Sequence, residues 1–167
     1  MHDDPALQAL AAHYQAMPPV AALQLRIAGF DGDCLRLHAP LAAHVNDKGC
    51  AFGGSLASLM TLAGWGLVTL RLQRAGLAAE VYVADSSVRY RAPLYANLAA
   101  EARLDDGQSW GAACSALREH GRAGIFLQAC VRLPDGDIAA EGRADGAAAP
   151  GLGWPLAPGQ ECRRCGC

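Results

Sequence analysis

The hydrophobic pattern of this chain centres on one segment that has no polar face. Between Ala51 and Leu70 there is no charged residue, and the apolar side chains of this run would point to every side of a helix. Such a helix is buried either by protein or by lipid. The run is about long enough to cross a bilayer, but it also holds several glycines and hydroxyl residues, and amphipathic segments on both sides need an apolar surface to pack against. We therefore expect a buried core helix and no membrane partner.

A short amphipathic helix is predicted at the N-terminus. Asp4 suits the capping position and Pro5 suits the first helical turn. The apolar residues that follow recur at helical spacing, and they are Leu7, Leu10, Ala11 and Tyr14. Pro18 and Pro19 end the pattern, because proline disrupts the interior of a helix.

Elsewhere apolar and polar residues alternate, which is the period of a half-buried strand. This alternation predicts strands from Leu23 and around Leu35, and later strands at roughly Glu80–Arg91, Leu98–Asp105, Ile125–Leu133 and Ile138–Arg143. Gly76 is a candidate C-cap of the core helix, and a short helix is predicted from Ser109 to about Gly121. Strands with one apolar and one polar face are typical of an antiparallel sheet that packs on a core.

The strand predicted at Glu80–Arg91 is the longest, and simple alternation assigns its two faces. One face would carry Tyr82, Ala84, Ser86, Val88 and Tyr90, and the other Val81, Val83, Asp85, Ser87, Arg89 and Arg91.

The apolar helix and the five or six amphipathic strands complement each other. A strongly curved sheet can wrap the helix and bury most of its surface, which defines an α+β fold. We expect an N-terminal helix at residues 1–17, the main domain at residues 18–147 and a Pro- and Gly-rich tail at residues 148–167.

Charge and cysteine usage narrow the cellular setting and the partners. The net charge of −2 gives no electrostatic attraction for nucleic acid. The seven cysteines are odd in number and several lie in apolar runs, which favours free thiols in a reducing cytoplasm. The acidic N-terminus lacks the pattern of a signal peptide. Cys162, Cys165 and Cys167 in the tail fall short of a four-ligand zinc site, so we expect no metal and no cofactor.

The polar loop and the start of the core helix carry the most specific signal. The run Asn46-Asp47-Lys48-Gly49, then Ala51-Phe52-Gly53-Gly54-Ser55-Leu56 and Leu62-Ala63-Gly64-Trp65, resembles the signature of the YiiD C-terminal thioesterase-like family of the hotdog-fold superfamily. Asp85 to Tyr90, followed by Pro93, is similar to that family's third strand, and the resemblance extends over roughly Pro18 to Ala147. It implies a hotdog fold, in which a curved antiparallel sheet wraps a long central helix. It also implies a homodimer, or a dimer of dimers, with sheets paired edge to edge and active sites at the interface.

The chain departs from one better-known group of relatives at two places. Phenylacetate-type hotdog thioesterases have an Asn, a Gly and then His-Gly-Gly at the helix start, and Asn46, Gly49 and Phe52-Gly53-Gly54 match this spacing with Phe in place of His. Those enzymes also place an acidic residue about two turns into the helix, where this chain has Leu59, Met60 and Thr61. Their mechanism therefore does not transfer directly.

Thioester hydrolysis needs a polarised carbonyl, an oriented water and a base. Backbone N–H groups at a helix N-terminus favour developing negative charge, and Gly53 and Gly54 let a carbonyl oxygen approach that backbone closely. The alternative is that both glycines only permit a tight turn and close packing. Asp47 is the candidate general base or nucleophile, and Asn46 would orient water or substrate. The alternative is that these two residues only form a turn or cap.

Further side chains are candidates in the same chemistry. Phe52 and Ser87 are candidate substrate contacts. Asp85 is a second candidate base, which could reach a site from the partner protomer. The favoured interpretation of Asp85 is instead a salt bridge with Arg89 or Arg91 on the same strand face.

A thiol mechanism is a further option, with His44 as base and Cys50 as nucleophile beside a helix N-terminus. The resemblance argues against it, because related sequences usually have Thr at the position of Cys50. The leading expectation is hydrolysis of an acyl-CoA or acyl-carrier-protein thioester with a small or medium acyl group. The alternative from another class is a non-catalytic module that binds acyl thioesters.

Overall fold

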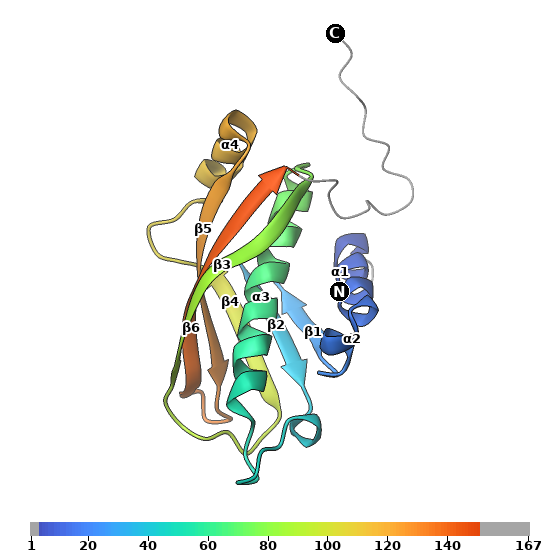
Figure 1. Cartoon of the computed structure of the whole chain (residues 1–167), viewed down its shortest axis with the longest axis vertical. Coiled ribbons are helices and arrows are strands. Elements are labelled where there is room, and N and C mark those ends of the chain that lie inside the picture. Colours follow the sequence, from blue (N-terminus) through green and yellow to red (C-terminus); the bar gives the residue numbers. More distant parts are fainter. Residues whose placement is uncertain (1–3, 151–167) are drawn as a thin grey trace.

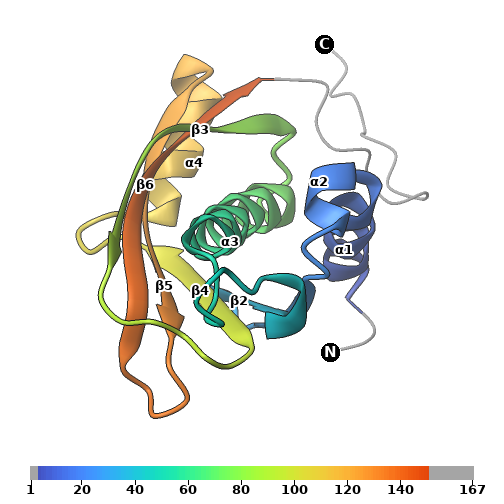
Figure 2. The ribbon, with the colours of Figure 1, turned by 60° about the horizontal axis from the view of Figure 1, so that its bottom comes forward.

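A curved antiparallel sheet wraps around one long helix in the computed structural model, which describes residues 4–150 (Figures 1 and 2). The elements are α1 (Pro5–Ala16), α2 (Pro18–Ala21), β1 (Arg26–Phe30), β2 (Cys34–Ala39), the 3-10 helix η1 (Leu41–Ala43), α3 (Gly53–Arg74), β3 (Ala79–Tyr90), β4 (Leu98–Leu104), α4 (Trp110–His120), β5 (Ala123–Arg132) and β6 (Ile138–Pro150). This is the expected hotdog fold.

The strand order places β3 far from the strand that follows it in sequence. Within residues 4–150 the sheet has six strands in the order β1-β2-β4-β5-β6-β3, and every neighbouring pair is antiparallel. β3 is therefore an edge strand that pairs with β6, and β1 forms the other edge. Figure 2 shows the sheet curving around α3 on one side, with α1 and α2 on the other.

The helix ends form where the sequence predicts them. Asp4 caps α1 by accepting a hydrogen bond from the Ala6 N–H at 2.9 Å, and Ser109 caps α4. Gly121 ends α4 in the left-handed conformation, with a φ of 68°. Gly76, with a φ of 69°, follows α3 in the same way. Glycine suits these two positions because it has no Cβ to clash.

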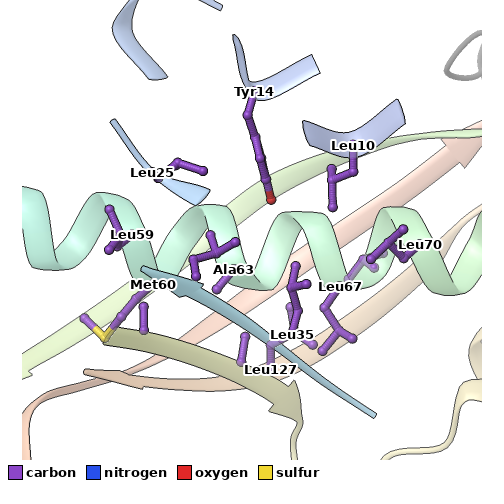
Figure 3. Packing of buried hydrophobic residues seen from close by; sticks show 14 of the residues in the cluster. Leu10, Tyr14, Leu25, Leu35, Leu59, Met60, Ala63, Leu67, Leu70 and Leu127 are labelled. Carbon is purple, nitrogen blue, oxygen red and sulfur yellow. The ribbon is translucent and has the colours of Figure 1, made fainter. Parts of the chain in front are cut away.

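The core lies between α3 and the inner face of the sheet. Leu59, Ala63 and Leu67 on α3 are fully buried, and Leu35 of β2 is fully buried against the same helix (Figure 3). By length and composition α3 is apolar enough to cross a membrane. In this fold it is the core helix.

Tyr14 of α1 closes the side of α3 that the sheet leaves open. Its ring points from α1 toward α3 in Figure 3, and its hydroxyl donates a hydrogen bond to the Leu62 carbonyl at 2.8 Å. The side chain is completely buried, and this burial raises the pKa of the Tyr14 hydroxyl. The predicted N-terminal helix is therefore part of the hydrophobic core.

Three element boundaries differ from the predicted ones. Pro18 ends the pattern of α1 but also begins α2, because proline is well suited to a first helical turn. β1 starts at Arg26 and not at Leu23, since Gln24 has a positive φ of 51° and turns the chain. β6 continues past Ala147, and Ala148 is buried in it. The tail cysteines lie outside the described residues.

A β-bulge in β3 changes the faces that simple alternation assigned. Val83 pairs with Gly146 and Asp85 with Asp145, so Ala84 is an extra residue on β3. One extra residue moves every later side chain to the opposite face. Val81 and Val88, which alternation placed on opposite faces, both pack against the core. The predicted face assignment is therefore wrong across the bulge.

The packing of α1 on α3 predicts a large cost for a methyl group at Gly66. A Cβ there would overlap the Tyr14 hydroxyl and lie 2.8 Å from Leu35 Cδ2. We expect Gly66→Ala to lower the free energy of unfolding by about 1–3 kcal/mol, measured by urea denaturation. The cost should shrink in a Tyr14→Phe background, because the overlapping hydroxyl is gone.

Gly111→Ala is the matched control. Gly111 is an exposed position of α4, where a Cβ would meet only Ser109 Oγ at 3.5 Å. We expect that change to be neutral or stabilising by up to about 1 kcal/mol, because alanine favours a helix. Equal effects at the two glycines would contradict the packing argument.

Candidate functional site

The N-terminus of α3 presents unused backbone N–H groups. Phe52 is the N-cap residue and supplies no side-chain hydrogen bond. The N–H groups of Ser55 and Leu56 donate to the Phe52 carbonyl at 2.9 and 3.2 Å. Among the hydrogen bonds of residues 4–150, the Gly53 and Gly54 N–H groups have no acceptor. The helix dipole adds partial positive charge at the same place, so this end of α3 can stabilise an anionic oxygen.

A cleft of about 310 Å³ lies beside this helix end. Its lining comes from the α3 start, the end of β3 and the segment that follows, namely Ala51, Gly53, Leu56, Tyr90, Arg91, Ala92, Pro93 and Leu94. Arg91 is the charged residue in this lining, and it forms an ion pair with Glu141 at 2.5 Å. The cleft is at the small end of the volumes typical of ligand sites.

Two exposed aromatic side chains flank the free N–H groups. The Tyr90 hydroxyl donates to the Gly53 carbonyl at 3.0 Å, and its ring lies 3.3 Å from where a Cβ on Gly53 would be. A Cβ on Gly54 would overlap the Phe52 ring. Phe52 and Tyr90 are 57% and 54% exposed, respectively, so both rings are available to a ligand. At both glycines a side chain would meet an aromatic ring, so glycine lets the two rings lie against the backbone without moving.

The loop before α3 is a tight turn held by Asn46. The Asn46 Oδ1 atom accepts hydrogen bonds from the N–H groups of Lys48 at 2.8 Å and Cys50 at 3.3 Å. Gly49 has a φ of 76°, which favours glycine. The Asn46 side chain is thus engaged in the turn, as the alternative to a substrate role had anticipated.

Neither candidate carboxylate lies in the cleft of this protomer. Asp47 is exposed, and both of its carboxylate oxygens lie 3.3 Å from the Lys48 amine. Asp85 is exposed on β3 and accepts a hydrogen bond from the Ser86 N–H at 2.7 Å. Within the described chain Asp85 forms no salt bridge with Arg89 or Arg91, so the interpretation favoured from the strand pattern is wrong. Arg91 pairs with Glu141 instead, because the bulge and the strand register bring those two side chains together.

His44 is buried and bonded to two segments at once. Its Nε2 lies 2.8 Å from the Leu23 carbonyl oxygen, so this nitrogen donates. Nδ1 then accepts from the Ser55 hydroxyl at 2.9 Å. Cys50 Sγ lies 3.3 Å from the Asn46 side-chain nitrogen. The structure therefore pairs His44 with Ser55 and not with Cys50, and it gives no support to the thiol mechanism.

Ser87 lies apart from the cleft. It belongs to the same strand as Tyr90, but after the bulge these two residues point to opposite faces, and Ser87 lines a cavity on the outer face. Tyr90 was not selected from the sequence as a site residue. Tyr90 lies three positions after Ser87 on the same strand, so alternation places the two side chains on opposite faces, and this spacing was the available signal that only one of them could face the helix. Among residues 4–150 no group of three or more His, Cys, Asp or Glu side chains could hold a metal ion.

Comparison with known proteins gives a consistent result. The family model of putative thioesterases named for the YiiD C-terminal domain matches residues 7–142. A Chlorobaculum tepidum protein of unknown function is 27% identical, with a TM-score of 0.81 over 86% of this chain and 94% of that one. A putative thioesterase from Shewanella oneidensis is also 27% identical, with a TM-score of 0.78 over 87% and 98% of the two chains. A Haemophilus influenzae thioesterase, 16% identical, shares the fold with a TM-score of 0.70 over 90% and 94%.

The buried contact between His44 and Ser55 predicts a structural role for this serine. Ser55→Ala removes the donor to His44 Nδ1 and leaves a buried acceptor unpaired, so we expect a loss of about 1–3 kcal/mol in the free energy of unfolding. Chemical denaturation followed by circular dichroism would measure it.

Ser58→Ala, one turn further along α3, serves as the comparison. Ser58 is half-buried and has no hydrogen bond of its side chain recorded within residues 4–150, so we expect a change within about 0.5 kcal/mol. A Ser55→Ala variant as stable as Ser58→Ala would show that the contact with His44 contributes nothing.

Proposed function

Because the chain belongs to the YiiD C-terminal family of putative thioesterases, we propose that it hydrolyses an acyl-CoA or acyl-carrier-protein thioester. The uncapped N-terminus of α3 is the observation that carries this proposal. Two free N–H groups, at Gly53 and Gly54, lie beside a cleft that the exposed Tyr90 lines, and the exposed Phe52 precedes them in the chain. Donors fixed before the reaction stabilise a developing oxyanion without reorganisation.

The proposed reaction places the thioester carbonyl oxygen on the Gly53 and Gly54 N–H groups. Water attacks the carbonyl carbon, a C–O bond forms, and the C–S bond then breaks to release a carboxylic acid and a thiol. A carboxylate takes a proton from the water, and the thiolate leaving group receives one. Tyr90 holds the end of β3 against the helix start through its bond to the Gly53 carbonyl, which fixes one wall of the cleft.

The base in this proposal is Asp47 or Asp85. Asp47 precedes the helix start in the chain, and Asp85 lies on the edge strand β3. Both carboxylates are exposed, so each could approach a substrate that is bound in the cleft. Asn46 remains a candidate for orienting substrate through its amide nitrogen, and Phe52 for contacting the acyl group. Ser87 could contact substrate only from the outer face of β3.

We propose a homodimer formed through β3. In the described part of the chain, the outer edge of β3 has no pairing strand, and its exposed side chains include Tyr82, Val83 and Tyr90. An apolar strand with an unpaired edge is a template for pairing with another chain. Such a dimer would carry Asp85 of one subunit toward the cleft of the other. The cytoplasmic location expected from the cysteines stays a prediction.

A non-catalytic module that binds acyl thioesters is the second candidate. The observation in its favour is the cleft lining, which includes no carboxylate from the described residues of the same protomer. The residues one to two turns into α3 also supply no carboxylate, since they are Leu59, Met60 and Thr61. The two candidates differ in whether bound thioester is turned over.

The deciding measurement is thiol release from a panel of acyl-CoAs of increasing chain length. We expect turnover by the unaltered protein and a loss of at least about 10²-fold in kcat for Asp47→Ala, because a general base typically contributes that much. Asp106→Ala is the control, since Asp106 is an exposed turn residue far along the chain from the loop.

Each result has a defined meaning. Saturable binding without turnover of any acyl-CoA would favour the binding module and refute hydrolysis of acyl-CoA. Turnover that Asp47→Ala leaves unchanged would exclude Asp47, and Asp85→Ala would then be the variant expected to lose activity.

The dimer has its own test. We expect light scattering to give twice the chain mass of 17.4 kDa, and Ser86→Lys to shift the protein toward monomer by placing like charges near each other at the strand edge. Ser115→Lys, at an exposed position of α4, should leave the mass unchanged. A monomeric unaltered protein would contradict the proposal.

A further inference from the structure

The outer face of the sheet holds a second cavity, of about 790 Å³, on the side away from α3. Strand register shows how it forms. Arg89, Glu141, Cys130 and Glu101 occupy directly opposed positions on β3, β6, β5 and β4, and Ser87, Arg143, Gln128 and Arg103 form the neighbouring row. Directly opposed residues share a face of the sheet. Each of the strands β3, β4, β5 and β6 contributes one arginine to the lining.

The lining carries more positive than negative charge. Four arginines contribute to it, Arg89, Arg103, Arg132 and Arg143, against the glutamates Glu101 and Glu141. The whole chain, by contrast, has a net charge of −2. This surplus is therefore local to the cavity.

Several protein groups donate to one oxygen of Glu101. Its Oε1 atom accepts from Arg132 Nη2 at 2.6 Å and from Arg103 Nη2 at 3.0 Å. Burial alone would raise its pKa, but hydrogen bonds from Arg132 and Cys130 and the charges of the two arginines hold the pKa of Glu101 below its ordinary value. The carboxylate stays ionised and holds Arg132 and Arg103 in place.

Two arginines of the lining, Arg89 and Arg143, have guanidinium N–H groups that are available to a ligand. Within residues 4–150 Arg89 has no ion-pair partner, and Arg143, whose side chain is 72% exposed, has a single distant one in Asp105 at 3.7 Å. Glu141 lies opposite Arg89 but forms its ion pair with Arg91, at 2.5 Å, and not with Arg89. A guanidinium carries five donors in a planar fork that matches phosphate oxygens.

The spacing of these arginines selects a ligand longer than one phosphate. β3 and β4 are separated by β6 and β5, which puts their backbones about 14 Å apart at the usual strand spacing. Arg89 and Arg143 lie on the adjacent strands β3 and β6, and Arg103 lies across the cavity on β4. A second copy of this chain is a poor occupant, because its matching face would bring the same surplus of positive charge, four arginines against two glutamates.

We propose that this outer-face cavity binds the diphosphate group of a larger ligand, with Arg89 and Arg143 holding the phosphates and Arg103 lining the opposite side. The group could belong to free ADP or to the ADP part of coenzyme A, which share this chemistry. The cavity is separate from the cleft at α3, since Arg89 and the adjacent Tyr90 point to opposite faces of the sheet. The site does not depend on hydrolysis at the cleft.

Titration calorimetry of the full chain with ADP at low salt tests the site without any turnover. We expect saturable binding of one ADP per chain that weakens as salt rises. AMP should bind at least about tenfold more weakly, and adenosine should not bind measurably. Arg89→Gln and Arg143→Gln should each weaken ADP binding at least about tenfold, because charge-assisted hydrogen bonds are lost. Arg122→Gln, an exposed arginine outside the lining, should not.

The results separate the possibilities. Displacement of ADP by coenzyme A, one for one, would support the site and identify the thioester carrier as its ligand, whereas simultaneous binding would support a free nucleotide. No ADP binding at millimolar concentration, equal binding of adenosine, or binding unchanged in the Arg89→Gln/Arg143→Gln double variant would overturn the proposal. Thermal unfolding of each variant confirms that a loss of binding is not a loss of fold.

Discussion

The need to bury α3 on every side governs this structure. An amphipathic helix can rest on a flat sheet, but Leu59, Leu67 and Val68, which point to different sides of α3, are all fully buried. Only a strongly curved sheet covers that much of one helix, and the remaining side is closed by α1 through Tyr14. The strand order leaves β3 at an edge of this sheet. The start of α3 lines a cleft that a ligand can reach.

The sequence was informative wherever an interaction spans a few residues. Asp4, Ser109 and Gly121 mark helix ends because a cap needs only its own turn. Periodicity located the strands for the same reason. The bulge at Ala84 escaped prediction, since an extra residue is defined only against the partner strand β6, and that partner lies more than fifty residues further along the chain.

The same distinction applies to the candidate site. The backbone part could be predicted, because Gly53 and Gly54 begin a helix whose first N–H groups have no partner within the helix. The side-chain part could not. Tyr90 meets Gly53 across 37 positions of sequence, and His44 meets the Leu23 carbonyl across 21. Asn46, whose type suggested catalysis, is engaged in holding its own turn.

The bulge at Ala84 also determines which side chains of β3 lie on each face of the sheet. A strand presents odd and even positions to opposite faces, so one extra residue reverses the parity of everything that follows it. With Ala84 in place, Tyr90 turns inward to the helix start and Arg89 turns outward to the arginine-rich cavity. If Ala84 were instead paired with β6 like its neighbours, every later residue would shift by one, the charged guanidinium would face the apolar core and the aromatic ring would face solvent. Among related chains, whether the extra residue bulges out of the ladder or is paired within it would then separate those able to keep both sites from those that can keep neither.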